Sequence, residues 1–261
     1  MEKKSFPYFF ILIRSWNCYR NLLKSINSAL KQDYRNFKIL FIDDASNYSN
    51  KQKNVIKKKL KSHIAVFNSK RKFAVCNAYY LLKNFADKKN AVVLNLDGDD
   101  WLLDTSVLSY LSMVYQKSPH CLLTWGECVF WNGKTYSKPS RLIKPYTNIS
   151  YPLKVVKESS YRRYPFLPLH PRTWKVSVFN QIKKASFLRP DGTWLQFAED
   201  QALFYPMLEM ARGRYKVIKK PLYAHNTTTK LSDAKINLTQ LLKDELIIRK
   251  RKSYEKFKQT A

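Results

Sequence analysis

Residues 91–101 decide the fold, and they read AVVLNLDGDDW. The run from Ala91 to Leu96 is apolar except for one asparagine, which is typical of a strand buried on both faces of a parallel sheet. Three carboxylates then surround a single glycine, and like charges this close raise the cost of ionising each other. A hard cation that prefers oxygen ligands, such as Mg²⁺ or Mn²⁺, would compensate them. The alternative is a polar loop that caps the following helix.

The first half of the chain alternates between strand-like and helical patterns. Helical apolar spacing begins after Asn17, the expected N-cap, and recurs over residues 51–60 and from Ala78 to Phe85. Short apolar runs separate these helices at residues 8–13, 37–42 and 64–67. Strands alternating with helices predict a parallel, doubly wound sheet.

A second pair of acids, Asp43 and Asp44, directly follows the apolar run 37–42. A doubly wound sheet binds its ligands at the carboxyl ends of its strands. We therefore expect Asp43 and Asp44 to share one rim with the acids of residues 97–100. Independent helix caps do not predict this pairing in a chain with only 19 acidic residues. The convergence favours a ligand site over two unrelated capping loops.

The second half of the chain is less regular. We expect two strands over residues 122–125 and 128–131, with a turn at Asn132-Gly133. Residues 141–168 are rich in proline, tyrosine and basic residues, and are expected to form a long functional loop or partly ordered lid. Further elements are expected as helices over residues 173–182 and 200–211 and as a short strand over residues 215–218.

The composition suits one large globular domain, because the 261 residues are 45% hydrophobic. Lysine and arginine number 48 against 19 acidic residues, which gives a formal net charge of +29. Such a surface attracts polyanions, and nucleic acid, anionic lipid headgroups and phosphorylated small molecules all qualify. The four cysteines form no C-x-x-C pair, and no apolar run is long enough to span a bilayer. We expect a cytoplasmic protein, either free or at the membrane periphery.

The order of these motifs resembles glycosyltransferase family 2, whose members have the GT-A fold. The resemblance covers residues 9–226 and rests on the two acid clusters, on Glu199-Asp200 before a helix, and on LDGDDWL at residues 96–102. It also rests on TWG, LHPRT and YPMLEM at residues 124–126, 169–173 and 205–210. It implies an α/β, Rossmann-like, mostly parallel sheet flanked by helices, with an irregular acceptor-side half. The implied divisions are a nucleotide-sugar half (1–115), an acceptor and catalytic half (116–235) and a basic C-terminal helix (236–261).

The resemblance implies a binding site for a nucleotide sugar, most of all a UDP-sugar, with Mn²⁺ or Mg²⁺. Asp43 matches the acid that contacts the base, and Asp97 and Asp99 match the D-x-D pair that reaches the ribose and binds the metal. His225 matches a further metal or diphosphate ligand, with an ordinary surface histidine as the alternative. Lys70 and Arg71 fall where the family often touches the nucleotide, although Lys72-Phe73 replaces the usual glycine there.

The resemblance also implies the catalytic residue, Asp200, which would take the proton from an acceptor hydroxyl and lead to inversion at the sugar carbon. The alternative is that Glu199 and Asp200 only complement the dipole of the following helix. The acceptor would be a glycan, a protein or a lipid-linked molecule. Other residues expected around the acceptor or behind the metal ligands are Asp100, Trp101, His170, Arg172, Trp194 and Glu199.

The tail, residues 238–257, carries an apolar stripe among basic residues. Leu241, Leu242, Leu246 and Ile247 form it, with helical spacing. Such a helix either rests on an anionic membrane that bears a lipid-linked acceptor or docks on its own domain. The second explanation is the simpler one.

Two other classes of protein compete with the transferase. A nucleic-acid-binding basic protein would explain the charge but not the acid clusters, and we find no zinc-finger or RNP signature. We therefore expect no specific nucleic acid partner. A metal-dependent phosphohydrolase also needs carboxylates beside a strand, but its acid pair normally follows the first strand and here it follows the fourth.

Overall fold

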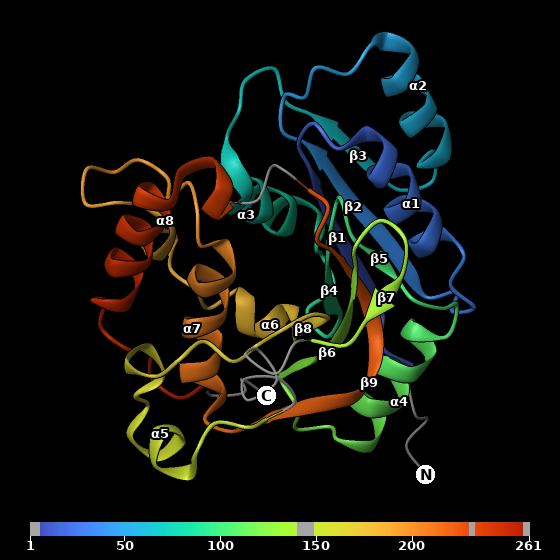
Figure 1. The fold of residues 1–261 in the computed structure, drawn as a ribbon. Helices are drawn as coiled ribbons and strands as arrows, with labels where there is room; N and C mark the ends of the chain where they lie inside the picture. Colours follow the sequence, from blue (N-terminus) through green and yellow to red (C-terminus); the bar gives the residue numbers. More distant parts are fainter. Residues whose placement is uncertain (1–5, 140–148, 230–232, 258–261) are drawn as a thin grey trace.

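The computed structural model describes residues 6–139, 149–229 and 233–257 (Figure 1). Its first half alternates strands and helices as predicted. The four strands pair in the order β3-β2-β1-β4 and are all parallel. These elements are β1 (Phe9–Ser15), α1 (Tyr19–Leu30), β2 (Phe37–Asp43), α2 (Asn50–Lys59), β3 (Ile64–Phe67), α3 (Phe73–Phe85) and β4 (Val92–Asp97).

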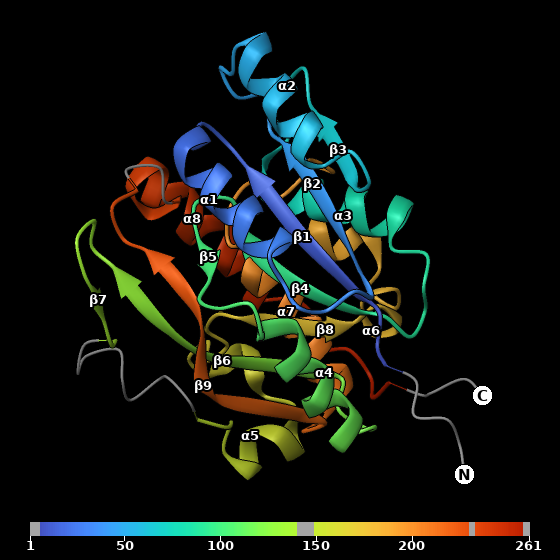
Figure 2. The same ribbon diagram turned by 90° about the vertical axis from the view of Figure 1, so that its right-hand side faces the viewer.

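Both faces of this sheet are covered, which explains why its strands are apolar at nearly every position. In β1, Phe9, Ile11 and Ile13 pack toward α1, α2 and α4 (Val107–Lys117). Phe10 and Leu12 pack toward the other face, against α3 and α7 (Glu199–Ala211). Figures 1 and 2 show the helices on the two sides of the sheet.

The second half extends the same sheet with mixed pairing (Figure 2). β8 (Arg172–Lys175) lies antiparallel between β4 and β6 (Leu123–Trp131), and β9 (Tyr215–Asn226) runs parallel to β6. The short strands β5 (Trp101–Leu102) and β7 (Tyr136–Ser137) pair with β9 and β6. The result is the α/β fold expected, a mostly parallel sheet between helices.

Several expectations for this half are wrong. Residues 173–182 are not one helix, because β8 takes up their first part and only the short helix α6 (Val176–Phe179) follows. Thr173 and Trp174 are fully buried between β4 and β6. Their burial in the sheet overrides a weak helical pattern.

Other boundaries also differ. The two strands expected around Gly126 are one strand, β6, with a register shift at the bulge between Gly126 and Cys128. Asn17 is not a helix cap, since Cys18 occupies that position and the Asn17 side chain accepts a hydrogen bond from the Asn47 N–H. β9 is longer than the predicted strand over residues 215–218 because it continues along β6 past the bulge.

The expected loop over residues 141–168 contains structure. It holds α5 (Leu153–Glu158) and a 3-10 turn (Tyr161–Arg163), while residues 140–148 lie outside the described residues. The C-terminal helix α8 (Asp233–Arg249) is kinked at Asn237, which has a non-helical φ of −159° and ψ of 82°. Across the described residues, no helix combines the length and the apolar character needed to cross a bilayer.

Candidate functional site

A cavity of about 500 Å³ opens at the carboxyl ends of β1 and β4. The chain leaves β1 toward β2 on one side and returns to β4 on the other, so this is the point where a doubly wound sheet binds its ligands. One wall comes from the strand ends and the other from the start of α7. The acids that line it are Asp44, Asp97, Asp99, Asp100, Glu199, Asp200 and Glu245.

Gly98 explains how the acid cluster sits against β1. Its N–H donates to the Arg14 carbonyl at 3.0 Å, and a Cβ at this position would lie 2.5 Å from that carbonyl oxygen. No larger residue fits without moving the backbone. The glycine therefore fixes where Asp97 and Asp99 emerge from β4.

Arg14, at the end of β1, joins the two walls of the cavity. Its guanidinium contacts Asp97 Oδ1 at 2.7 Å and also contacts the carboxylate of Glu199, and its side chain is only 7% exposed. Burial opposes ionisation of Asp97, yet the cations around it lower the pKa of its carboxyl to about 2. Burial raises the pKa of Glu199 to about 7 despite the contact with Arg14. Sequence reasoning missed Arg14, although one charged residue near the end of an apolar strand was the available signal.

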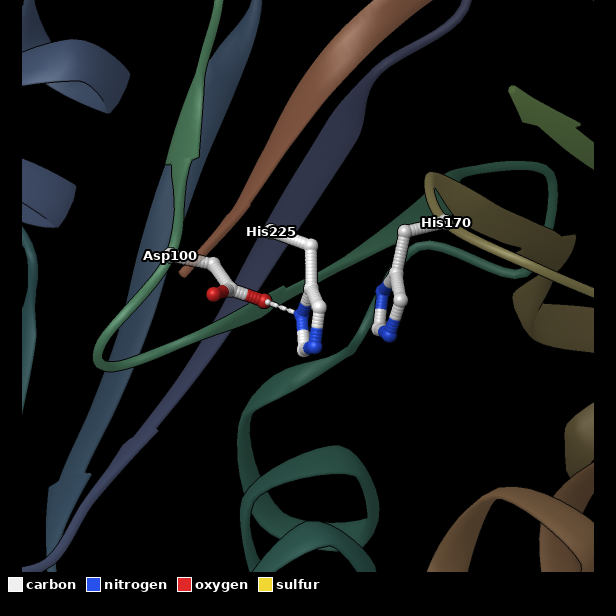
Figure 3. A group of neighbouring side chains, drawn as sticks. All are labelled: Asp100, His170 and His225. Atoms are coloured by element: carbon white, nitrogen blue, oxygen red, sulfur yellow. Dashed lines mark hydrogen bonds and ion pairs between the residues drawn. The ribbon is translucent and has the colours of Figure 1, made fainter. Parts of the chain in front are cut away.

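Asp100 orients His225 (Figure 3). Its Oδ2 lies 3.0 Å from His225 Nδ1, and its Oδ1 accepts the Asn226 N–H at 2.7 Å. A carboxylate on one ring nitrogen fixes the ring and leaves the other nitrogen for a ligand. Burial opposes protonation of His225, but the hydrogen bond to Asp100 outweighs it and raises the pKa of the ring.

His170 stands beside His225, with the two rings nearly parallel and their centroids 5.9 Å apart (Figure 3). Its Nε2 lies 3.2 Å from an Arg172 nitrogen and 3.6 Å from Asp97 Oδ2. Burial and the Arg172 charge lower the pKa of His170, and the nearby Asp97 carboxylate opposes this shift. The ligand atoms of Asp100, His170 and His225 all lie within 4.8 Å of one another. This group differs from the predicted one, which combined His225 with Asp97 and Asp99.

Asp99 shares the rim of the cavity with the carboxylates of Asp97 and Asp100. Burial, followed by the charges of Asp100 and Asp97, raises the pKa of its carboxyl to about 7. By contrast, Arg14 balances Asp97 and His225 accompanies Asp100. Carboxylates and imidazoles together are a donor set that divalent cations accept, so the chemistry of these residues fits a metal ion.

Asp200 faces the cavity from the first turn of α7. Its Oδ2 lies 3.3 Å from an Arg172 nitrogen, its Oδ1 accepts the Gln201 N–H at 2.8 Å, and its side chain is 32% exposed. The helix begins after Ala198, whose φ of 55° turns the chain sharply into it. Ala198 makes no side-chain cap. Glu199 and Asp200 lie in the first turn, where negative charge interacts favourably with the helix dipole.

The sequence model for glycosyl transferase family 2 matches residues 10–189, more than half of the chain. The chain belongs to this family. Its fold is similar to crystal structures of S. aureus TarS 1-349, alone and in complex with UDP-GlcNAc. The TM-score is 0.61 for both structures. For the free structure the sequence identity is 18%, and the match covers 84% of this chain and 60% of TarS 1-349. For the UDP-GlcNAc complex the identity is 17%, and the match covers 85% of this chain and 59% of TarS 1-349. A complex of the same protein with UDP gives a TM-score of 0.59.

At this identity the similarity to TarS shows a shared fold. The chain spans about 60% of the length of the TarS fragment. No curated protein sequence matches the chain. The family 2 glycosyltransferase assignment therefore comes from the family model and agrees with the GT-A-like fold.

Two of the nucleotide-side residues predicted for this glycosyltransferase lie away from the cavity. Asp43 is fully buried, and its oxygens accept hydrogen bonds from the Ser46 N–H and hydroxyl, so it organises the loop after β2. Lys70 is exposed and outside the cavity lining. Asp44 lines the cavity instead, and it accepts the N–H groups of Lys72 and Phe73.

Arg71 lies where it was predicted, on the cavity wall. Its guanidinium carbon is 3.4 Å from the ring centroid of Trp16, a cavity residue that sequence reasoning missed. Phe73, in the Lys72-Phe73 pair expected to stand where the family usually has glycine, has a φ of 64°. The Phe73 N–H donates to Asp44 and its ring packs on Phe197, and these contacts hold the left-handed backbone.

Neither predicted tryptophan lines the cavity. Trp101 is buried under Lys24 and donates its Nε1–H to the Tyr136 hydroxyl. Trp194 packs on Tyr79 with ring centroids 5.3 Å apart. Trp101 directly follows Asp100 and Trp194 precedes Glu199 by five residues, but both side chains pack against neighbouring residues.

Proposed function

We propose that this family 2 glycosyltransferase moves a sugar from a UDP-sugar to an acceptor hydroxyl, depends on a divalent metal, and inverts the configuration at the anomeric carbon of the sugar. The observation that carries the proposal is a single cavity with the Asp97-Gly98-Asp99 turn on one wall and Asp200 on the other. The choice of uridine is supported by TarS, which shares the fold and has been solved with UDP and UDP-GlcNAc.

The donor set at the rim suits Mn²⁺ or Mg²⁺. We propose Asp99 and His225 as ligands, with Asp97 beside them in the cavity lining. Asp100 and His170, whose ligand atoms lie close to that of His225, would support or complete the set of ligands. Imidazole ligands favour Mn²⁺ over Mg²⁺. When bound, such an ion supplies positive charge to the departing diphosphate.

Asp200, not Glu199, fits the role of the base. Glu199 is buried and held by Arg14, whereas Asp200 is partly exposed in the cavity and is steadied by Arg172. Its carboxylate would accept the proton of the acceptor hydroxyl as that oxygen attacks the sugar carbon. Because Asp200 then acts on the acceptor and no protein nucleophile bonds to the sugar, the product is inverted.

The nucleotide base would lie against Trp16 and Arg71. The Arg71 guanidinium lies over the Trp16 ring, and both residues line the cavity together with Asp44. Flat aromatic faces suit base stacking, and Asp44 replaces Asp43 as the nearby acid. Arg71 also carries positive charge toward the donor.

A binding screen tests the proposal. The full chain would be titrated by calorimetry with UDP-, GDP- and dTDP-sugars, with and without Mn²⁺. We expect a UDP-sugar to bind tightly only with Mn²⁺, and Asp99→Ala to weaken this binding by at least about tenfold. The matched control is Asp87→Asn, an exposed acid outside the cavity lining. Unchanged binding by Asp99→Ala would refute the metal assignment.

A further inference from the structure

The C-terminal helix α8 has two faces of different character. Its inner face is tied to the domain through Asp244, which is fully buried and binds Arg189 and the N–H groups of Gln196 and Phe197. Leu241 and Glu245, on the same side, line the cavity. The inner face is therefore part of the catalytic domain.

The outer face presents leucines to solvent. Leu238, Leu242 and Leu246 follow at intervals of four residues and are 54%, 50% and 56% exposed. The stripe seen in the sequence is thus divided, because Leu241 and Ile247 pack against the core while Leu242 and Leu246 do not. A row of half-exposed leucines on one helix face indicates a surface that meets something apolar.

The charges near the exposed leucines indicate which kind of partner fits this surface. On or just beyond α8, Lys235, Lys243, Lys250 and Lys252 are exposed, in a chain with a formal net charge of +29, whereas Arg249 and Arg251 donate to backbone carbonyls of the domain. Lys243 and Lys250 are exposed, and Lys243 and Leu246 together line an open surface pocket. A second copy of the chain would bring these lysines against each other, which is unfavourable. An anionic bilayer accepts both the leucines and the lysines.

We propose that the outer face of α8 docks this protein on an anionic membrane surface. Leu238, Leu242 and Leu246 enter the interface, and Lys243 and Lys250 meet lipid phosphates. Since the inner face of α8 borders the cavity, docking places the cavity close to the bilayer. Under the proposed function, on which this last point rests, that position suits a lipid-linked acceptor.

Co-flotation of the full chain with vesicles tests the proposal without any donor or acceptor, so its failure is separate from a failure of sugar transfer. The vesicles contain phosphatidylcholine with phosphatidylglycerol, or phosphatidylcholine alone. We expect binding only to the anionic vesicles, weakened by salt. The double variant Leu242→Ser, Leu246→Ser keeps the charge and should bind roughly tenfold more weakly.

The matched control is Met113→Ser, a half-exposed apolar residue on α4, which covers the opposite face of the sheet (Figure 1). It should bind like the unmodified chain, and thermal melting checks that all variants are folded. Three results would overturn the proposal: no binding to anionic vesicles, equal binding by the double variant, or a dimer in light scattering that the double variant abolishes. Equal binding would mean that diffuse charge alone attracts the chain to polyanions.

Discussion

The two halves of the sheet reach the same cavity by different means. From β1 to β4 a helix separates each strand from the next, and parallel pairing carries the acids to one edge. In β8, β6 and β9 the pairing is mixed, and the functional groups come from a helix start and a strand end far apart in sequence. In the first half the local sequence pattern determines where the functional residues lie, whereas in the second half long-range packing determines it. Arg14, in the first half, contacts Glu199 in the second.

The largest effect is expected from removing that link. Arg14→Met leaves Asp97 and Glu199 without their buried cation, which should destabilise the protein by about 3–5 kcal/mol. Urea unfolding measures the change, with Arg35→Met, an exposed arginine, as the control. Equal stability of the two variants would show that the halves are held together without Arg14.

Metal binding should strengthen the same junction. At a free Mn²⁺ concentration 100 times its Kd, the protein should gain about 2.7 kcal/mol, which raises the Tm by several degrees. Thermal melting in Mn²⁺ and in EDTA measures the gain. Asp99→Asn should lose most of it, and an undiminished shift would place the ion outside the predicted rim.

Gly98 tests the first half alone. Gly98→Ala puts a Cβ 2.5 Å from the Arg14 carbonyl oxygen and should displace the turn, weakening donor binding by about 1–3 kcal/mol. Gly192→Ala is the control, because Gly192 has a φ of 83° but open space around it and lies outside the cavity lining. That variant should lose a little stability and keep its donor affinity.

The smallest effect is expected from two tryptophans, one that lines the cavity and one that does not. Trp16→Ala removes the surface beside Arg71 and should weaken UDP binding by about 1–2 kcal/mol. Trp194→Phe, outside the cavity lining, should change it by less than about 0.3 kcal/mol. Titration with UDP measures the affinity of both variants. If Trp194→Phe weakened UDP binding more than Trp16→Ala, Trp194 and not Trp16 would be the residue that contacts the base.

The same contrast explains what the sequence could predict. The parallel strands, their helices and the acids after β4 were predictable because local hydrophobic periodicity determines them. β8 was mistaken for helix because its neighbours β4 and β6, distant in sequence, decide its conformation. Asp43 and Asp44 were indistinguishable in sequence, since only the Ser46 hydrogen bonds show which one turns inward.

Residues that act through a distant partner were equally hidden. Arg14 and Trp16 acquire their roles only when Glu199 and Arg71 fold against them. Trp101 and Trp194 were expected near the site from sequence adjacency alone, which says nothing of side-chain direction.

Under the proposed function, the first half binds the donor and Asp200, from the second half, activates the acceptor. Asp200→Asn, tested with UDP-sugar, Mn²⁺ and an acceptor found by screening, measures both halves in one variant. We expect an unchanged donor Kd and a turnover reduced by about 10²–10⁴-fold. Normal turnover by Asp200→Asn would contradict the account.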